Sequence, residues 1–331
     1  MDTTSHICMG VATGMVISSV ATRGGFDVDH STIITMSIIA NNMPDIDVLF
    51  KLKSNESYIN NHRTKSHSIS LFVVWLILLT VFGTIFSDEN SKLIFIVCFI
   101  GLFSHIITDL FNGYGIQLFW PFSKKWIAMG ITYTIDVLFI ITHLVMFALM
   151  FFFKESVILI FACGYTFLLL YIFLSYLYHF ELKRKLVKKY GRYKRLILQS
   201  KPTPFRWKYV YETTDKKFYI GTIKNNTINQ LRYEKRKETI NKSLEEKLKE
   251  NNDLKAFLDF TPIFNYTIKE EKDSKIIKFY DLRYLSVKED KQYYTFNCIV
   301  EVKNDSVINS YVGFSIKENS ASKKFLKKIN E

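Results

Sequence analysis

Residues 68–86 read SISLFVVWLILLTVFGTIF, an apolar run without a charged side chain. A helix rises about 1.5 Å per residue, so a run of this length crosses the roughly 30 Å hydrocarbon core of a bilayer. In lipid the backbone must satisfy its own hydrogen bonds, which a helix does within one segment. The stretch therefore predicts a transmembrane helix, and it decides the class of fold.

Other apolar runs lie on both sides of this one along the chain. Three have the length of a span, and these are residues 92–110, 132–153 and 156–178. Two weaker runs, residues 7–21 and 31–44, contain Gly, Ser, Thr and Asn. The weaker runs fit either short spans or helices packed within the protein. We therefore predict a polytopic bundle of transmembrane helices.

The composition of the chain changes at about residue 180. Before it Ile, Leu, Phe, Val and Met dominate, and after it Lys, Arg, Glu, Asn and Tyr do. The polar part looks helical at 231–258 and then alternates apolar and polar residues with period two, which is typical of strands. We predict a mainly α protein in three parts: a transmembrane helical domain at 1–180, a basic juxtamembrane linker at 181–208 and a small, strand-rich α+β domain at 209–331.

A dense run of basic side chains follows the last apolar run. Its members are Lys183, Arg184, Lys185, Lys188, Lys189, Arg192, Lys194 and Arg195. Beside a membrane span such a run favours contact with anionic lipid on the cytoplasmic face over nucleic-acid binding, which we do not expect. Counting spans back from it places the loop around Arg63 and the 111–131 loop on the same side. We expect a multi-pass protein of the plasma membrane with a cytoplasmic C-terminal domain.

Ionisable side chains in or beside membrane spans are costly and therefore mark candidates for function. On the predicted topology, several segments bring such residues to one depth on the cytoplasmic side. The candidates are His6, Asp45, Asp47, His62, His67, His105, Asp109 and Asp136. Of these, His105 and Asp109 are four apart and share a helix face. Imidazoles and carboxylates without Cys suit zinc, iron or manganese in a hydrolytic site, and so many ligands allow one or two ions.

Simpler interpretations compete with a shared site. The stretch HRTKSH at 62–67 also fits an interfacial basic cluster, and the pair Asp45 and Asp47 fits a helix-end turn with Asp as a cap. We interpret His143 and His179 as interfacial or bundle-packing residues and His30 as a solvated loop residue. Two other functions stay open: an ion or proton-coupled transporter that uses the intramembrane His and Asp, and a membrane-tethered module that binds a partner. The gathering of candidates on one side of the membrane favours a single metal site over both.

Several motifs together resemble the YdjM family of membrane-bound metal-dependent hydrolases, and within it the YfhP type. They are HICMG from residue 6, PDID from residue 44, NHRTKSHS from residue 61, SHIITDLFNGYGIQLFWPFS from residue 104, and Asp136. The resemblance covers residues 1 to about 140 and extends more loosely through TPFRWKYVYET at 203–213. It implies a His/Asp-rich metal site in a helical bundle. The family is also similar to zinc-dependent phospholipase C enzymes, which implies hydrolysis as the reaction class.

These observations predict a membrane-embedded hydrolase that cleaves a phosphoester of an amphiphilic or lipid substrate with a metal-activated water. The expected ion is zinc, with manganese or iron as alternatives. A carboxylate that is not fully used in ligation, Asp45 or Asp47, would take the proton of the water. Arg63 would neutralise negative charge on the phosphoryl group, because a guanidinium matches the geometry of phosphate.

Overall fold

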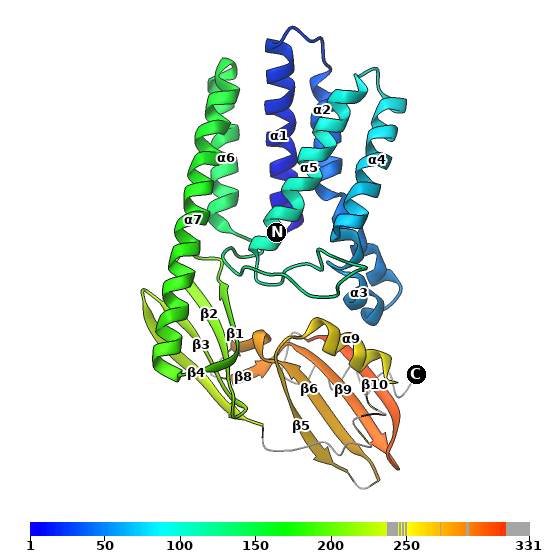
Figure 1. Ribbon diagram of the computed structural model, residues 1–331, viewed down its shortest axis with the longest axis vertical. Helices are drawn as coiled ribbons and strands as arrows, with labels where there is room; N and C mark the ends of the chain where they lie inside the picture. Colours follow the sequence, from blue (N-terminus) through cyan, green and yellow to red (C-terminus); the bar gives the residue numbers. More distant parts are fainter. Residues whose placement is uncertain are drawn as a thin grey trace.

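The computed structural model describes residues 1–236, 244, 246, 248, 250–271, 273–288 and 291–315. In this part of the chain an upright bundle of helices stands on a strand-rich part (Figure 1). Five of the described helices are long and apolar enough to cross a membrane: Thr3–Arg23, His30–Leu52, Ile69–Phe86, Ser91–Phe111 and Lys154–Tyr190. The predicted fold class, a polytopic bundle followed by a strand-rich domain, is confirmed.

The helical segments follow one another with short connections, except for a long loop between α5 and α6. They are α1 (Thr3–Arg23), α2 (His30–Asn42), the 3-10 helix η1 (Met43–Leu52), α3 (Asn55–Asn61), the 3-10 turn η2 (Lys65–His67), α4 (Ile69–Phe86), α5 (Ser91–Phe111), α6 (Val137–Phe152) and α7 (Val157–Tyr190). The two weak apolar runs form α1 and α2. The mean hydropathy of α1 is 1.3 against 2.6 for α4, and 44% of α1 is buried within the protein against 17% of α4. The weak runs are less apolar because they face other helices.

Helices α1 and α2 lie in close contact because α1 carries glycines where the two meet. A Cβ atom on Gly10 would lie 2.7 Å from the Cα of Ile38, and one on Gly14 would lie 2.6 Å from the Cα of Ile34. Gly10 and Gly14 form the Gly-x-x-x-Gly spacing that lets membrane helices approach backbone to backbone. This contact sets how near η1, which continues α2, lies to the start of α1.

We expect Gly14→Val to lower the free energy of unfolding by about 1–3 kcal/mol, because the added side chain meets backbone that can only move away. Thermal unfolding of the purified protein in detergent measures the change. Val20→Leu on the same helix is the matched control, since Val20 is exposed on the outside of the bundle. Equal melting temperatures for the two variants would contradict the close contact.

The stretch at 181–208, expected to be a linker, is regular structure. Residues 181–190 are the last turns of α7, which runs beyond the bundle along the first sheet (Figure 1). Leu182 and Leu186 are fully buried against that sheet. Residues four apart share a helix face, so these two leucines anchor the helix while the basic side chains occupy its other faces. The remainder of the stretch enters the first two strands, and the expected boundary at 208 falls inside one of them.

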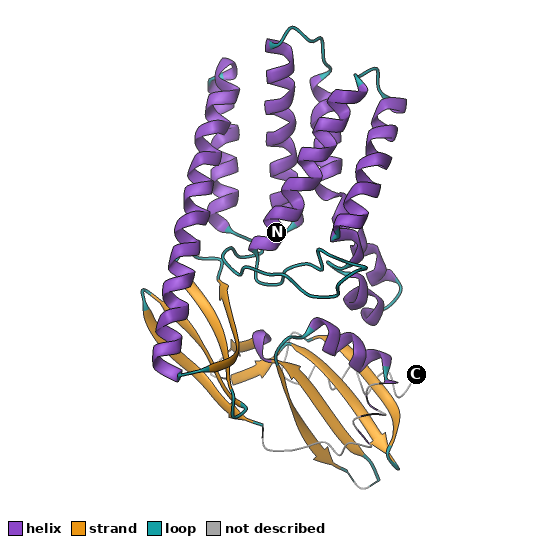
Figure 2. Cartoon of the chain, viewed as in Figure 1, coloured by secondary structure: helices purple, strands orange, loops and turns teal. Residues whose placement is uncertain are grey.

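Two antiparallel four-stranded sheets dominate the described C-terminal residues (Figure 2). The first has the order β1-β2-β3-β4, from Tyr193–Ser200, Arg206–Thr213, Lys217–Lys224 and Thr227–Lys235. The second has the order β10-β9-β6-β5, from Ser306–Phe314, Phe296–Lys303, Lys275–Asp281 and Phe264–Glu270. The shorter strands β7 (Leu285–Lys288) and β8 (Lys291–Tyr294) pair with each other, and α9 (Asn252–Phe260) packs on the second sheet.

The helix expected at 231–258 is only partly present. Its beginning belongs to β4 and its end to α9, while residues 237–243 lie outside the described residues. Alternation of charged and aromatic side chains in QLRYEK places this stretch on an edge strand, where one face is exposed. Helix α9 buries Leu254 and Phe257, three apart, in the core of the second sheet.

A long loop, residues 112–136, crosses between the bundle and the strand-rich part (Figure 2). Trp126 Nε1 donates a hydrogen bond of 2.9 Å to a backbone carbonyl of α9. Tyr114 stacks on Tyr284 with 5.9 Å between ring centroids. Helix α3 joins the core of the second sheet through Ile59. The strand-rich part therefore supports both segments that connect the helices at this end of the bundle.

Candidate metal centre

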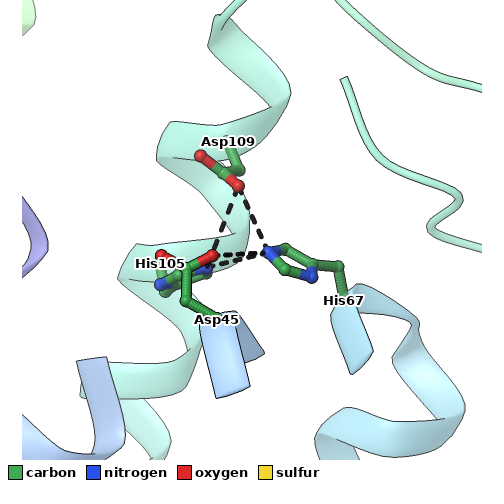
Figure 3. A group of neighbouring side chains, drawn as sticks. All are labelled: Asp45, His67, His105 and Asp109. Atoms are coloured by element: carbon green, nitrogen blue, oxygen red, sulfur yellow. Dashed lines mark hydrogen bonds and ion pairs between the residues drawn. The ribbon is translucent and has the colours of Figure 1, made fainter. Parts of the chain in front are cut away.

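Four of the predicted site residues come together at the end of the bundle that faces the strand-rich part. Asp45 lies on η1, His67 on η2, and His105 and Asp109 on α5 (Figure 3). One ligand atom from each of them lies within 4.8 Å of the others. Three segments that are far apart in sequence thus present their side chains to one point, and only Asp45 is partly exposed there.

The distances between these atoms match the edges of a small tetrahedron. His67 Nε2 lies 3.1 Å from His105 Nε2. It also lies 3.3 Å from Asp45 Oδ1 and 3.3 Å from Asp109 Oδ2. His105 Nε2 lies 3.8 Å from each of the same two oxygens. Ligands about 2.0–2.1 Å from a tetrahedral ion are separated from one another by about 3.3 Å. The group therefore has the size of a first coordination sphere.

The ring of His105 is oriented so that Nε2 carries a lone pair. Its Nδ1 lies 2.6 Å from the backbone oxygen of Asn41, and a carbonyl oxygen can only accept a hydrogen bond. Nδ1 therefore holds the proton of the neutral ring, and Nε2 turns its lone pair toward the group. Histidines that bind metals characteristically donate their other N–H to a carbonyl or carboxylate in this manner.

In His67, as in His105, the proton of the neutral ring lies on Nδ1, and here a serine determines this. The hydroxyl of Ser66 donates its one hydrogen to Asp47 Oδ2 at 2.8 Å. The same hydroxyl oxygen lies 2.9 Å from Nδ1 of His67, so in this contact the imidazole must be the donor. The Nε2 atom of His67 is then left with a lone pair that points at the two carboxylates.

Two imidazole lone pairs and two carboxylate oxygens therefore face one another in a largely buried space. Asp109 Oδ2 has no hydrogen-bond donor among the described residues. Electron-rich atoms at such distances repel unless a cation or a proton lies between them, and both rings already hold their proton on the far nitrogen. The donor set and its orphaned oxygen fit a divalent metal ion.

The other oxygen of Asp109 faces cationic groups. Arg63 Nη2 lies 3.4 Å from Oδ1, and the amino group of Met1 forms an ion pair with it. His6 Nε2 lies 3.6 Å from this oxygen, and the His6 ring stacks on His105 with centroids 3.8 Å apart. Both ring nitrogens of His6 are buried and have no hydrogen-bond partner among the described residues. His6 thus lies beside the group of four and is not one of its members.

Asp47 lies on the Nδ1 side of the His67 ring and organises the loop before it. Its Oδ2 accepts the backbone N–H of Arg63 at 2.9 Å, and its Oδ1 lies 3.0 Å from Nδ1 of His62. Arg63 has a φ of 59°, in the left-handed region that a non-glycine residue occupies only when its surroundings hold it there. The structure thus places Asp47 and His62 on the side of His67 that faces away from the group of four.

Asp136 lies at the start of α6 and caps that helix. Its carboxylate accepts the backbone N–H groups of Leu138 and Phe139 and the hydroxyl of Tyr171 at 2.8 Å. None of its hydrogen bonds to described residues involves the group of four. His143, interpreted as a packing residue, is buried within α6 and bonds its Nδ1 to the backbone oxygen of Phe139.

Two residues that hold the centre together were not among the predicted ones. Asn41 acts through its backbone oxygen, which any residue would supply, so its identity carries no signal. Ser66 acts through its hydroxyl, and its place directly before His67 in HRTKSHS was the available signal. A hydroxyl beside a ligating histidine is a common orienting partner.

Comparison with known proteins agrees with this arrangement. Residues 1–182 match the family described as YdjM inner membrane protein, a range that contains all of the residues above. The chain belongs to the YdjM family. Residues 243–325 match the family described as YfhP C-terminal alpha/beta plait domain. Among curated proteins, the chain is similar to the uncharacterized protein YfhP of Bacillus subtilis (strain 168), with 30% identity over 98% of each chain. No solved structure matches the chain significantly.

Membership of the YdjM family confirms the resemblance noted in the sequence, including its YfhP type. The family is one of inner membrane proteins, in agreement with the described apolar helices, so this chain is a multi-pass membrane protein. Within it, the His/Asp group described above is able to hold a metal ion.

Proposed function

We propose that this YdjM-family protein is a metal-dependent hydrolase that cleaves a phosphoester of an amphiphilic substrate at the membrane surface. The observation that carries the proposal is the convergence of four lone-pair donors from η1, η2 and α5, with both histidine tautomers determined by partners outside the group. Buried histidines that serve packing alone need no such arrangement.

Asp45, His67, His105 and Asp109 would hold the ion. Two imidazoles and two carboxylates at tetrahedral spacing suit zinc best, and manganese or iron next. A bound divalent ion supplies Lewis acidity and lowers the pKa of a water toward neutrality. The cationic Arg63 already faces the second oxygen of Asp109, which favours one ion over two.

Asp45 is the residue best placed to take a proton from water. Its side chain is 17% exposed, whereas those of His67, His105 and Asp109 are fully buried. Solvent and substrate therefore reach the group from the side of Asp45. A general base must lie within hydrogen-bond reach of the attacking water, and the oxygen of Asp45 that is not used to hold the ion would meet this requirement. Asp47, which the sequence offered as the alternative base, is occupied by the loop that it organises.

The surroundings of Asp45 support an amphiphilic substrate. The 3-10 helix η1 exposes a series of large apolar side chains directly after it: Ile46, Val48, Leu49, Phe50 and Leu52. Within the loop at 112–136, Phe119 and Phe122 are exposed as well. Apolar side chains at the end of a membrane bundle favour contact with acyl chains. A lipid-like molecule could therefore place its tail against η1 and its phosphoester near Asp45.

Arg63 would bind the phosphoryl group. Its side chain is buried, and Nη1 has no hydrogen-bond partner among the described residues. Nη2 donates to the backbone oxygen of Met1 at 3.0 Å, which holds the guanidinium in place. Burial lowers the pKa of this guanidinium, yet an arginine remains charged at neutral pH. A preorganised cation with a free N–H stabilises the negative charge that develops on a phosphoryl oxygen.

The test is turnover of a panel of lipid and soluble phosphoesters by the purified, metal-loaded protein. We expect hydrolysis of at least one lipid phosphoester, and Arg63→Met to reduce kcat/KM by about 10²–10³-fold with the metal retained. Arg195→Met serves as the control, because that arginine is exposed on the first sheet. The proposal fails if the metal-loaded protein hydrolyses no phosphoester, or if Arg63→Met matches the control.

We further propose that the metal centre faces the cytoplasm. The loops at this end of the bundle carry Lys51, Lys53, Lys124 and Lys125, and α7 carries its basic run past the same end. Cytoplasmic loops of membrane proteins are enriched in Lys and Arg. The basic side chains between 183 and 195 would then contact anionic lipid headgroups where α7 leaves the membrane.

A further inference from the structure

A cavity of about 250 Å³ lies between the membrane bundle and the strand-rich part, apart from the metal centre. Three segments line it: α3 with the residues that follow it, the loop at 112–136, and one face of α9. Lys65 belongs to the cavity, while His67 of the same 3-10 turn belongs to the metal centre. The turn η2 therefore separates two distinct sites.

Basic side chains outnumber acidic ones in the lining of the cavity. Lys65, Lys124 and Lys255 reach it from the three segments, against the two carboxylates Glu56 and Asp259. None of the three lysines forms an ion pair with a described residue. The three lysines are exposed, and the two carboxylates balance part of their charge, so the lining keeps an excess of positive charge that an anion can neutralise.

Neutral groups in the cavity complete a site for a phosphate. Gln117 has a buried side chain that makes no hydrogen bond to a described residue, so its amide is free to donate. Trp120 stands beneath Lys65, with the ammonium 5.5 Å from the ring centroid. Trp126 bonds its Nε1 to a backbone oxygen of α9 and holds the far wall. Aromatic rings and unpaired N–H donors around an excess of positive charge suit a small molecule that carries a phosphate group.

The volume limits the ligand. Pockets for drug-sized molecules run from about 300 to 1,000 Å³, so this cavity takes something smaller. A phosphate with a glycerol-sized body is of the right size. Such a group occurs both as the headgroup of an anionic phospholipid and as a soluble phosphomonoester.

We propose that this cavity is a binding site for a phosphate-bearing anion of glycerol phosphate size, which bridges the membrane bundle and the C-terminal part. Lys65 and Lys124 hold the anion from the membrane side, and Lys255 holds it from α9. The site is independent of the metal centre and of the hydrolysis proposed there.

The experiment uses the full-length protein and follows tryptophan fluorescence, since two of the four tryptophans line the cavity. One arm titrates glycerol 3-phosphate and inorganic phosphate into protein in phosphatidylcholine nanodiscs. The other arm compares nanodiscs of phosphatidylcholine alone with nanodiscs that also contain phosphatidylglycerol. The test variant is Lys124→Gln with Lys255→Gln. The matched control is Lys125→Gln with Lys303→Gln, two exposed lysines on the same loop and the same domain that do not line the cavity.

We expect a saturable fluorescence change and a rise in melting temperature with ligand for the wild-type protein and the control. In the test variant the apparent Kd should rise roughly fivefold for each lysine removed. A response to the soluble probes identifies a soluble phosphomonoester, and a response only to phosphatidylglycerol identifies a lipid headgroup. No saturable response in either arm, or the same Kd for test variant and control, overturns the proposal.

Discussion

The purified protein is expected to bind one divalent metal ion per chain, and His105→Ala is expected to release it. Removing a partner that merely orients a ligating histidine typically weakens metal affinity by about 10–100-fold, so the loss of the ligand itself should exceed about 100-fold. Metal content after gel filtration and a competition titration with a chelator measure the change. Ser66→Ala should fall within the smaller range, since it removes the hydroxyl that orients His67 and bonds to Asp47 but leaves all four ligands in place.

His143→Ala is the matched control for His105→Ala. Both histidines are fully buried in the bundle and both bond Nδ1 to a backbone oxygen, but His143 lies on α6 away from the group of four. Metal content should therefore remain at one ion per chain in His143→Ala. If both variants keep their metal, or if both lose it while thermal unfolding shows that they remain folded, the assignment of His105 as a ligand is refuted.

Asp281→Asn is expected to lower the free energy of unfolding of the C-terminal domain by about 3–5 kcal/mol, because it leaves the buried charge of Arg283 without its partner. The Asp281 side chain is fully buried and that of Arg283 is 4% exposed. The guanidinium donates to both carboxylate oxygens at 2.7–3.1 Å and also to the backbone oxygen of Phe260. The carboxylate further raises the pKa of Arg283 against the effect of burial.

Hydrogen exchange of the central strands β6 and β9 measures this loss, since their protection reports opening of the domain. Asp215→Asn is the control, because that carboxylate pairs with Lys217 at the surface, where ion pairs contribute little. Unchanged protection in Asp281→Asn would show that the pair does not support the domain. The ion pair of Asp281 and Arg283 also fixes the turn that carries Tyr284, which stacks on Tyr114. Hydrogen exchange of the loop at 112–136 should therefore change together with that of the strands.

Much of the bundle was predictable because a transmembrane helix is recognised from the hydropathy of consecutive residues. The four strong apolar runs became α4 to α7, and the depth of the candidate ligands followed from their places at the span ends. The pair His105 and Asp109 was predictable for the same reason, since residues four apart share a face of a regular helix. The end of α7 was missed, although Leu182 and Leu186 show the same spacing within the basic run.

The different roles of Asp45 and Asp47 could not be read from PDID. The two residues lie on a 3-10 helix with three residues per turn, so positions two apart point to different sides. Asp45 therefore meets the histidines, and Asp47 meets the loop that follows α3. The sequence offered both as ligands because it did not show which side of the segment after Pro44 faces the histidines, and that depends on packing.

By itself the sequence determined that the chain is a membrane bundle with a strand-rich domain and that its His and Asp residues gather at one end. Hydropathy and local spacing suffice for that, because they act over a few consecutive residues. Only the tertiary structure decided which four atoms meet. Their lone pairs are aimed by the backbone oxygen of Asn41 and the hydroxyl of Ser66, and folding brings these partners together from different segments. The direction of a lone pair depends on neighbours that are close in space but can be distant in sequence, and local sequence patterns do not show which residues these are.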